Sequence, residues 1–446
     1  MVDLINGKIG KSIFRFAVPM FIGNLFQQLY NIMDSVIVGN FLGKEALAAV
    51  GASFPIVYTL IALIIGIGSG GTVVVSQYYG ANDIAKVKRS IDTIFIFLFV
   101  ASLITSTLGI IFAVPLFGLL QLPENLIPEA TIYLRIFLGG MIVFFGFSGI
   151  SSILRGLGDS KTPLYFLVIS TIVNIILDLL FILVFKWGIA GAALATVIAQ
   201  GGAFISLVIY LNKTHDIIKF RFTNISFDWV IFKDIVRIGL PTGFQQTFVA
   251  LGMMALLGIV NGFGTDVIAA YTVAGRIDAM ASMPAMAFSA ALATFVGQNI
   301  GAGQIERVKQ GLRSTIIMST IYCLFISVIA IVFGEFLMGM FTNDANVIRV
   351  GHEYLIIVSS FYILFTLMFA FTGVQRGAGA TLIPMFITLI SLWLIRIPIA
   401  YFLSKEIGET GIWWAIPIAW AVGMIGSSGY YFSGKWKNKG VVKNKI

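Results

Sequence analysis

Three carboxylates, Asp34, Asp178 and Asp278, lie well inside long apolar stretches of this chain of 446 residues. A charged side chain in the centre of a bilayer costs about 2.5–3.5 kcal/mol on insertion scales. Such a residue therefore faces protein or water rather than lipid, and it indicates an ion or substrate pathway. Asn174 precedes Asp178 by four residues, so the two side chains share one helix face.

Depth along the expected helices places four oxygen-bearing side chains in one layer. At 1.5 Å per residue, Asp34 lies about 7 Å below the outer end of its stretch, and Asp178 about 12 Å below its own. Thr196, in the stretch that follows, is also about 12 Å from the outer side, and Asn174 is about 6 Å deeper than Asp178. Three separate helices thus contribute to one polar layer.

This layer predicts a cation site. Two carboxylates, an amide oxygen and a hydroxyl are oxygen ligands of the kind that small hard cations take, and two carboxylates in low dielectric can also share a proton. The alternative for Asn174 and Thr196 taken singly is a polar contact that only joins helices. We expect Na⁺ or H⁺ to bind here, with the same four residues as metal ligands if the ion is Na⁺: Asp34, Asn174, Asp178 and Thr196.

A polar stripe leads along the first apolar stretch toward Asp34. Such a stripe must face protein or water, and Tyr133 in the fourth stretch is at a depth that reaches Asp34. Pro19 interrupts the hydrogen-bond ladder of the same helix and predicts a hinge. We expect the substrate cavity to be lined by Gln27, Tyr30, Asn31 and Tyr133.

The composition is that of a membrane protein that crosses the bilayer many times. Hydrophobic residues make up 58% of the chain, charged residues only 11%, and the mean hydropathy is +0.97, whereas soluble domains carry about 25% charged residues. Because only helices and closed barrels satisfy their backbone in lipid, and the alternation of a barrel is missing, we predict α-helices. Twelve stretches are long enough to span: 13–38, 51–79, 90–118, 129–153, 162–185, 188–211, 235–262, 267–297, 313–336, 348–373, 381–403 and 411–433.

The net charge of +9 is unevenly distributed. Segments on the side of the N-terminus hold 22 Lys and Arg, the opposite loops hold four, and three arginines (Arg135, Arg276 and Arg396) lie within spans. This bias predicts that both termini are cytoplasmic. The basic tail then anchors on anionic lipid rather than on nucleic acid.

Three motifs occur twice. SQYYGANDIAKVK at 76–88 returns as GQNIGAGQIERVK at 297–309, and RGLGDSKTP at 155–163 returns as RGAGATLIP at 376–384. IFRFAVP at 13–19 returns as IVRIGLP at 235–241. The nearly constant separation between the two copies of each motif predicts an internal duplication of six spans in parallel orientation. Alternating-access transporters use this plan.

The duplication predicts an all-α protein of two six-helix bundles related by a pseudo-two-fold axis, V-shaped with a central cleft. We expect an N-terminal bundle over 1–212, a cytoplasmic linker over 213–233, a C-terminal bundle over 234–434 and a basic tail over 435–446. Because the cleft forms within one chain, we expect a monomer.

Several chemistries are excluded. No stretch offers the GxxxxGK[ST] phosphate loop, so we expect no nucleotide site. The single cysteine, Cys323, excludes an internal disulfide and a thiolate metal cluster, and the two histidines, His215 and His352, lie far apart. A membrane-embedded enzyme would need such a cluster, so we expect no enzyme and no cofactor besides the coupling ion. Asp278 has either a structural or a rim role, and Arg396 either contacts carbonyls or binds an anionic group.

The chain resembles the multidrug and toxic compound extrusion (MATE) family. The residues that carry the resemblance are the two repeats, MDSVIVGN at the end of the first span, RGLGDSKTP before the fifth, and AYTVAGRIDAMASMPAMAFSAALATFVGQNIGAG at 270–303. The last is similar to bacterial members of the DinF and MepA type, and the likeness covers roughly residues 10 to 435.

The resemblance implies a cation-coupled antiporter that exports organic cations and other amphipathic drugs in exchange for Na⁺ or H⁺. The cation site of the family's N-terminal lobe carries over onto Asp34, Asn174, Asp178 and Thr196. One departure matters: a second branch of the family places acids in spans seven and ten, and here 241–262 and 355–373 contain none. Coupling is therefore expected in the N-terminal bundle.

One transport alternative remains open. A flippase of lipid-linked oligosaccharides shares this architecture, and it predicts a cavity with several Arg and Lys for pyrophosphate. An ion channel is disfavoured by the duplicated plan and the lack of a short pore loop.

Overall fold

The computed structural model describes residues 1–120, 122–215, 217–219 and 225–442, and every regular element in these ranges is helical. Contacts divide the chain into two units. Unit 1 comprises Met1 and Pro19–Gly239, and unit 2 comprises Val2–Val18 and Leu240–Ile446. The predicted all-helical fold class is confirmed.

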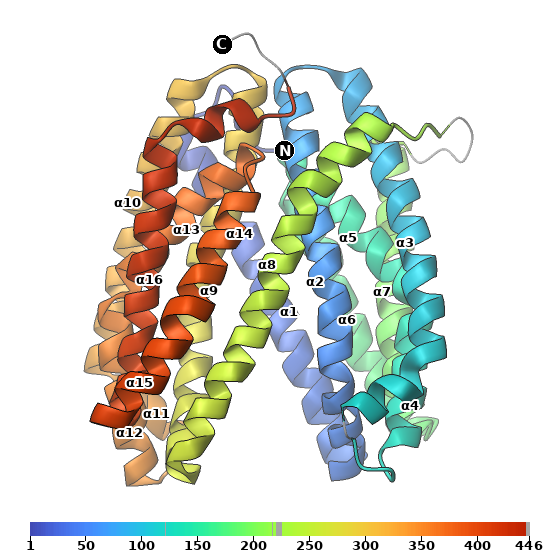
Figure 1. Cartoon of the computed structure of the whole chain (residues 1–446). Helices are drawn as coiled ribbons and strands as arrows, with labels where there is room; N and C mark the ends of the chain where they lie inside the picture. Colours follow the sequence, from blue (N-terminus) through green and yellow to red (C-terminus); the bar gives the residue numbers. More distant parts are fainter. Residues whose placement is uncertain (121, 216, 220–224, 443–446) are drawn as a thin grey trace. The chain divides into compact units, whose positions relative to one another are not determined.

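Unit 1 is a bundle of long helices (Figure 1). Within it α2 packs on α3, α4 and α5, while α6 packs on α7, and α4 and α5 also contact α7. A side-chain cap begins α3, where the Asp83 carboxylate accepts a hydrogen bond from the Lys86 N–H (3.0 Å). Its helices are most of α1 (Ile9–Phe41), α2 (Lys44–Gly80), α3 (Ile84–Leu119), α4 (Ile127–Gly139), α5 (Met141–Gly156), α6 (Lys161–Leu179), the π-helix η1 (Leu180–Val184), α7 (Gly188–Thr214) and the start of α8 (Trp229–Val260).

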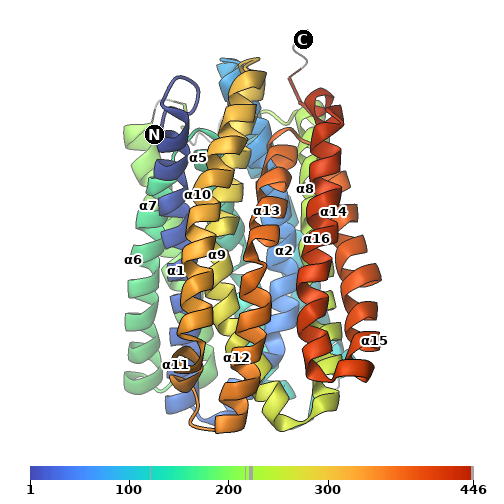
Figure 2. The ribbon, with the colours of Figure 1, turned by 90° about the vertical axis from the view of Figure 1, so that its left-hand side faces the viewer.

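Unit 2 is built around α9, which packs on α10, α12 and α13 (Figure 2). α16 packs on α12, α13 and α15, and a buried aromatic core of Tyr354 and Trp413, with Tyr271 packed on it, joins α9, α12 and α16. Its elements are the remainder of α8, η2 (Asn261–Phe263), α9 (Thr265–Gly301), α10 (Ile305–Val332), α11 (Gly334–Gly339), α12 (Ala345–Ser360), α13 (Tyr362–Gly377), α14 (Leu382–Leu389), the π-helix η3 (Ile390–Arg396), α15 (Ile397–Ile407), α16 (Glu409–Phe432) and η4 (Lys435–Lys439).

Among the described residues, nine helices, or eleven with two bent pairs, are long and apolar enough to cross a membrane. Each bent pair, Ile127–Gly139 with Met141–Gly156 and Ala345–Ser360 with Tyr362–Gly377, turns by 47°. The first predicted span, α1, is a continuous helix of 33 residues but falls outside this set. Its Asn and Gln residues lower its hydropathy, and those residues belong to the candidate site.

The two units differ from the expected domain ranges in two segments. The first residues of α1 pack in unit 2, where Ile13 and Phe16 are fully buried and the Phe14 ring lies 6.3 Å from Phe288. Conversely, α8 begins in unit 1, and a Cβ at Gly70 of α2 would lie 2.3 Å from the Ile235 carbonyl oxygen. Only glycine permits this close crossing of backbones.

Both helices change unit at a repeated motif. The boundary in α1 falls directly before Pro19, and the boundary in α8 falls directly before Leu240, one residue before Pro241. The expected linker over 213–233 and the tail over 435–446 lie partly outside the described residues, and the division into functional lobes stays a prediction.

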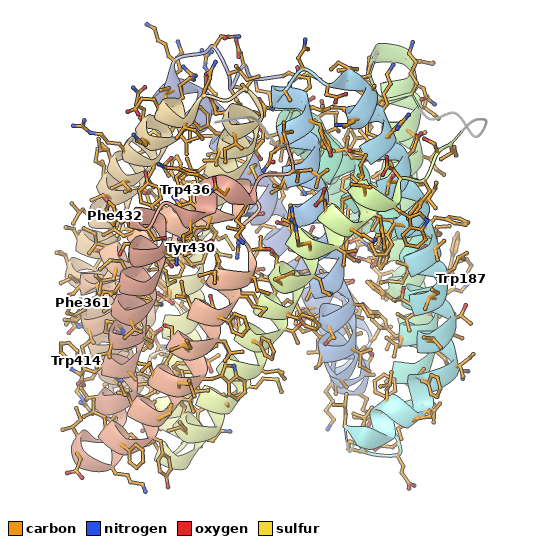
Figure 3. The ribbon with its side chains drawn as sticks, turned by 45° about the horizontal axis from the view of Figure 1, so that its top comes forward. Trp187, Phe361, Trp414, Tyr430, Phe432 and Trp436 are labelled. Atoms are coloured by element: carbon orange, nitrogen blue, oxygen red, sulfur yellow. The ribbon has the colours of Figure 1, made fainter. Side chains whose placement is uncertain are left out.

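Aromatic side chains are exposed toward the ends of several helices, as membrane proteins commonly place them at the interface. Trp187 precedes α7, Trp414 lies in the second turn of α16 and Phe432 ends α16 (Figure 3). Trp436 differs, because it is buried, stacks on Tyr431 at 5.5 Å and donates its indole N–H to the Tyr431 carbonyl (2.9 Å). The tail helix η4 is thereby fixed to the end of α16.

Candidate functional site

Asp34 is buried on α1 of unit 1, with 8% of its surface exposed. It lies in the last third of a helix that begins at Ile9 and ends at Phe41. Its Oδ1 has no hydrogen-bond partner. A carboxylate thus stands in the protein interior without a donor.

Asn174, Asp178 and Thr196 are contributed by the packed helix pair α6 and α7. Their exposed fractions are 0%, 1% and 4%, respectively. The π-helix η1 begins two residues after Asp178, and short π segments inside α-helices frequently mark functional sites. The wider turn ends the regular ladder of α6 immediately beyond the carboxylate.

Thr196 joins the three helices. The Tyr30 hydroxyl of α1 donates to Thr196 Oγ1 at 3.0 Å, and the Asn174 amide of α6 donates to the same oxygen at 3.4 Å. Asp178 interacts electrostatically with Asp34 and lies beside the Asn174 side chain. All four predicted cation-site residues are therefore buried in one unit, and Asn174 and Thr196 are in direct contact.

The oxygens of this cluster lack donors. Asp34 Oδ1, Asn174 Oδ1 and both carboxylate oxygens of Asp178 are buried and have no hydrogen-bond partner. A buried polar atom without a partner carries a desolvation penalty of about 1–3 kcal/mol, and more when it is charged. A bound cation or a proton would remove that penalty. No group of three His, Cys, Asp or Glu in the described ranges could hold a metal ion.

The predicted cavity residues fall into two groups. Gln27 and Asn31 are exposed on α1, whereas Tyr133 is buried, near Asp34 and stacked on Phe137 at 6.3 Å. Asn24 and Gln28 belong to the polar stripe noted in the sequence but not to the predicted cavity set, and they are exposed on the same face as Gln27 and Asn31. Their three- and four-residue spacing was the available signal. Polar side chains exposed inside a span face water or protein.

The second repeat does not copy this cluster. The positions equivalent to Asp34 (offset 222, as for the first-span motif) and to Asn174, Asp178 and Thr196 (offset 221) are occupied by apolar residues, which cannot ligate a cation: Leu256, Ile395, Ile399 and Pro417.

Asp278 and Arg396 belong to unit 2 and are separate from this cluster. Asp278 lies near the Tyr362 hydroxyl and within electrostatic range of Arg396. Arg396 is buried, and its Nη1 approaches the sulfur of Met253 at 3.7 Å. Asp278, from another helix, is thus an acid within electrostatic range of Arg396.

Comparisons with known proteins agree along nearly the whole chain. The MatE family profile matches residues 19–180 and again 241–402, one match for each repeat. The chain is 34% identical over 435 residues to the probable multidrug resistance protein YpnP of Bacillus subtilis, covering 98% of this chain and 97% of that protein. It is 25% identical over 429 residues to the FAD transporter of Shewanella oneidensis, covering 93% and 92%.

Solved structures share the fold. An outward-facing multidrug resistance MATE family transporter superimposes with a TM-score of 0.90 at 24% identity, covering 98% of both chains. The two profile matches cover more than half of the residues and follow the internal repeat. The chain therefore belongs to the MatE family of membrane transporters.

Proposed function

We propose that this protein is a multidrug exporter that exchanges amphipathic organic cations for Na⁺ or H⁺. The observation that carries the proposal is the buried cluster of unit 1, in which Asp34, Asn174 and Asp178 present four oxygens without donors. The multidrug resistance proteins to which the chain is similar support a drug substrate. The transporter would work as a monomer in the bacterial plasma membrane, with both termini cytoplasmic and its basic tail on anionic lipid.

Coupling would arise from competition in unit 1. Asp34 and Asp178 would hold either the inorganic cation or the positive group of a drug, because both ligands would need the same buried oxygens. The hydrogen bond between Thr196 and Tyr30 would couple binding of the cation or drug to the position of α1, since it joins α7 to that helix. The exposed amides of Gln27 and Asn31 would contact the drug.

The motion would use Pro19. Alternating access needs a point at which α1 can bend, and the contact boundary of the units falls directly before this proline. The membrane potential supplies about 2.3 kcal/mol per charge per 100 mV, in addition to the ion gradient.

Uptake into inverted membrane vesicles tests the proposal. The probe is the ethyl ester of a rhodamine dye, a permanent cation, and Na⁺ and pH gradients are imposed separately. We expect at least one gradient to drive accumulation by the native protein and Asp34→Asn to abolish it. The exposed Glu124→Gln serves as a matched control that keeps full activity. Accumulation by Asp34→Asn at the native rate, with equal protein in the membrane, would contradict the proposal.

A further inference from the structure

The exposed residues of α9 in unit 2 form a single stripe. Successive members are three or four residues apart, which places them on one helix face. Met280 is 58% and Met286 40% exposed, while the opposite side of α9 is buried in the unit. The α9 stripe consists of the exposed residues Thr272, Arg276, Met280 and Met286, with the half-buried Met283 between the last two.

Arg276 shows what this stripe faces. It lies about 17 Å along the axis from Thr265, the first residue of α9, too far for its side chain to reach the membrane surface easily. A cation at this depth faces protein or a water-filled space rather than lipid. Arg276 is exposed and makes no hydrogen bond or salt bridge within the described part of the chain. Its guanidinium donors are therefore available to a ligand.

The methionines give the stripe a second property. Met is unbranched and polarisable, and surfaces rich in it bind differently shaped apolar and aromatic compounds. In the first repeat the positions equivalent to Arg276 and Met280 are Pro55 and Thr59, at an offset of 221. The combination of a cation with methionines is thus confined to unit 2.

We infer that the α9 stripe binds transported substrates and that Arg276 takes an anionic group on them, such as a carboxylate. The inference rests on the proposed export function and extends its substrate class from cations to zwitterions and anions with an apolar body. Arg276 would pair with the carboxylate, and Met280, Met283 and Met286 would contact the rings. Asp278 is on another face of α9, beside Tyr362, and does not compete for the ligand.

A matched pair of dyes tests the charge preference: a rhodamine with a free carboxylate, and the ethyl ester of the same dye. Binding to the purified full-length protein is followed by quenching of tryptophan fluorescence, which requires no ion gradient. We expect Arg276→Gln to weaken binding of the carboxylate dye about tenfold, as for loss of a charged hydrogen bond, and to leave binding of the ester within twofold. Arg276→Lys should restore most of the affinity, and Arg349→Gln, an exposed arginine of α12, should change neither dye.

Three results would overturn the inference. They are equal weakening of both dyes by Arg276→Gln, no change in either, or failure of the native protein to bind the carboxylate dye. The apolar part has its own test, in which Met286→Ala weakens both dyes alike while Met340→Ala, 67% exposed and outside α9, weakens neither. Loss of gradient-driven uptake with intact dye binding would count against the export function and leave this site standing.

Discussion

The hydroxyl of Tyr30 on α1 donates a hydrogen bond to Thr196 on α7, at 3.0 Å. The bond connects the helix that carries Asp34 to the helix pair that carries Asn174 and Asp178. Removing it with Tyr30→Phe leaves the ring in place and should lower apparent cation affinity about three- to tenfold, as for one hydrogen bond of 0.5–1.5 kcal/mol. The cation dependence of dye uptake measures this, and Tyr165→Phe, 61% exposed, is the control. Unchanged dependence would show that the bond is only structural.

Pro19 and Pro241 should act as a pair. Each lies where its helix passes from one unit to the other, and each removes one backbone hydrogen bond from its helix. Alanine at either position should restore the missing backbone hydrogen bond and straighten the helix. Dye turnover should then slow several-fold, with equilibrium binding of the dye unchanged. Pro55→Ala, in a helix that stays within unit 1, should have a smaller effect. Weakened dye binding with normal turnover would argue against a hinge.

The crossing of α2 and α8 should be sensitive to a single methyl group. A Cβ at Gly70 would lie 2.3 Å from the Ile235 carbonyl oxygen and 2.8 Å from the Gly239 nitrogen. Gly70→Ala should therefore destabilise the protein by about 1–3 kcal/mol, the usual cost of overpacking, and lower its midpoint of thermal unfolding in detergent. Gly118→Ala is the control, because nothing lies within 4 Å of the added carbon. Equal midpoints for the two variants would contradict the packing.

Trp436 should hold the basic tail. Its ring is 1% exposed and stacked on Tyr431, and its indole N–H is bonded. Trp436→Ala should release Lys435, Lys437 and Lys439. In inverted vesicles, trypsin should therefore cleave the tail of this variant faster than the tail of the native protein. Cleavage only in right-side-out vesicles would show that the C-terminus is outside, against the charge bias. Phe432→Ala, at an exposed position, should leave the rate unchanged.

Much of this fold could be predicted from residue chemistry, because lipid leaves few choices. Asp34 and Asp178 stood out since burying a carboxylate is costly, and depth along regular helices added Asn174 and Thr196. The repeated motifs indicated two equivalent halves. All four predicted cation-site residues are buried, and their role in coupling stays a prediction.

Other features depend on tertiary packing and had no local signal. The bond between Tyr30 and Thr196 joins residues 166 positions apart, and the proximity of Asp278 to Arg396 requires the folded unit. The sequence also gives no sign that α1 and α8 pass from one unit to the other, since both motifs have the pattern of an ordinary helix with a proline. Which unit a helix end joins is decided by close contacts such as Gly70 with Ile235.

Displacement of the coupling ion by drug tests the central claim most directly. The purified protein is loaded with radioactive Na⁺ or held in weakly buffered solution, the rhodamine ester is added, and released Na⁺ or H⁺ is counted per bound dye. We predict release of one of these ions from the native protein and none from Asp34→Asn with Asp178→Asn. Tight dye binding to the native protein with no release of either ion would contradict competition at Asp34 and Asp178.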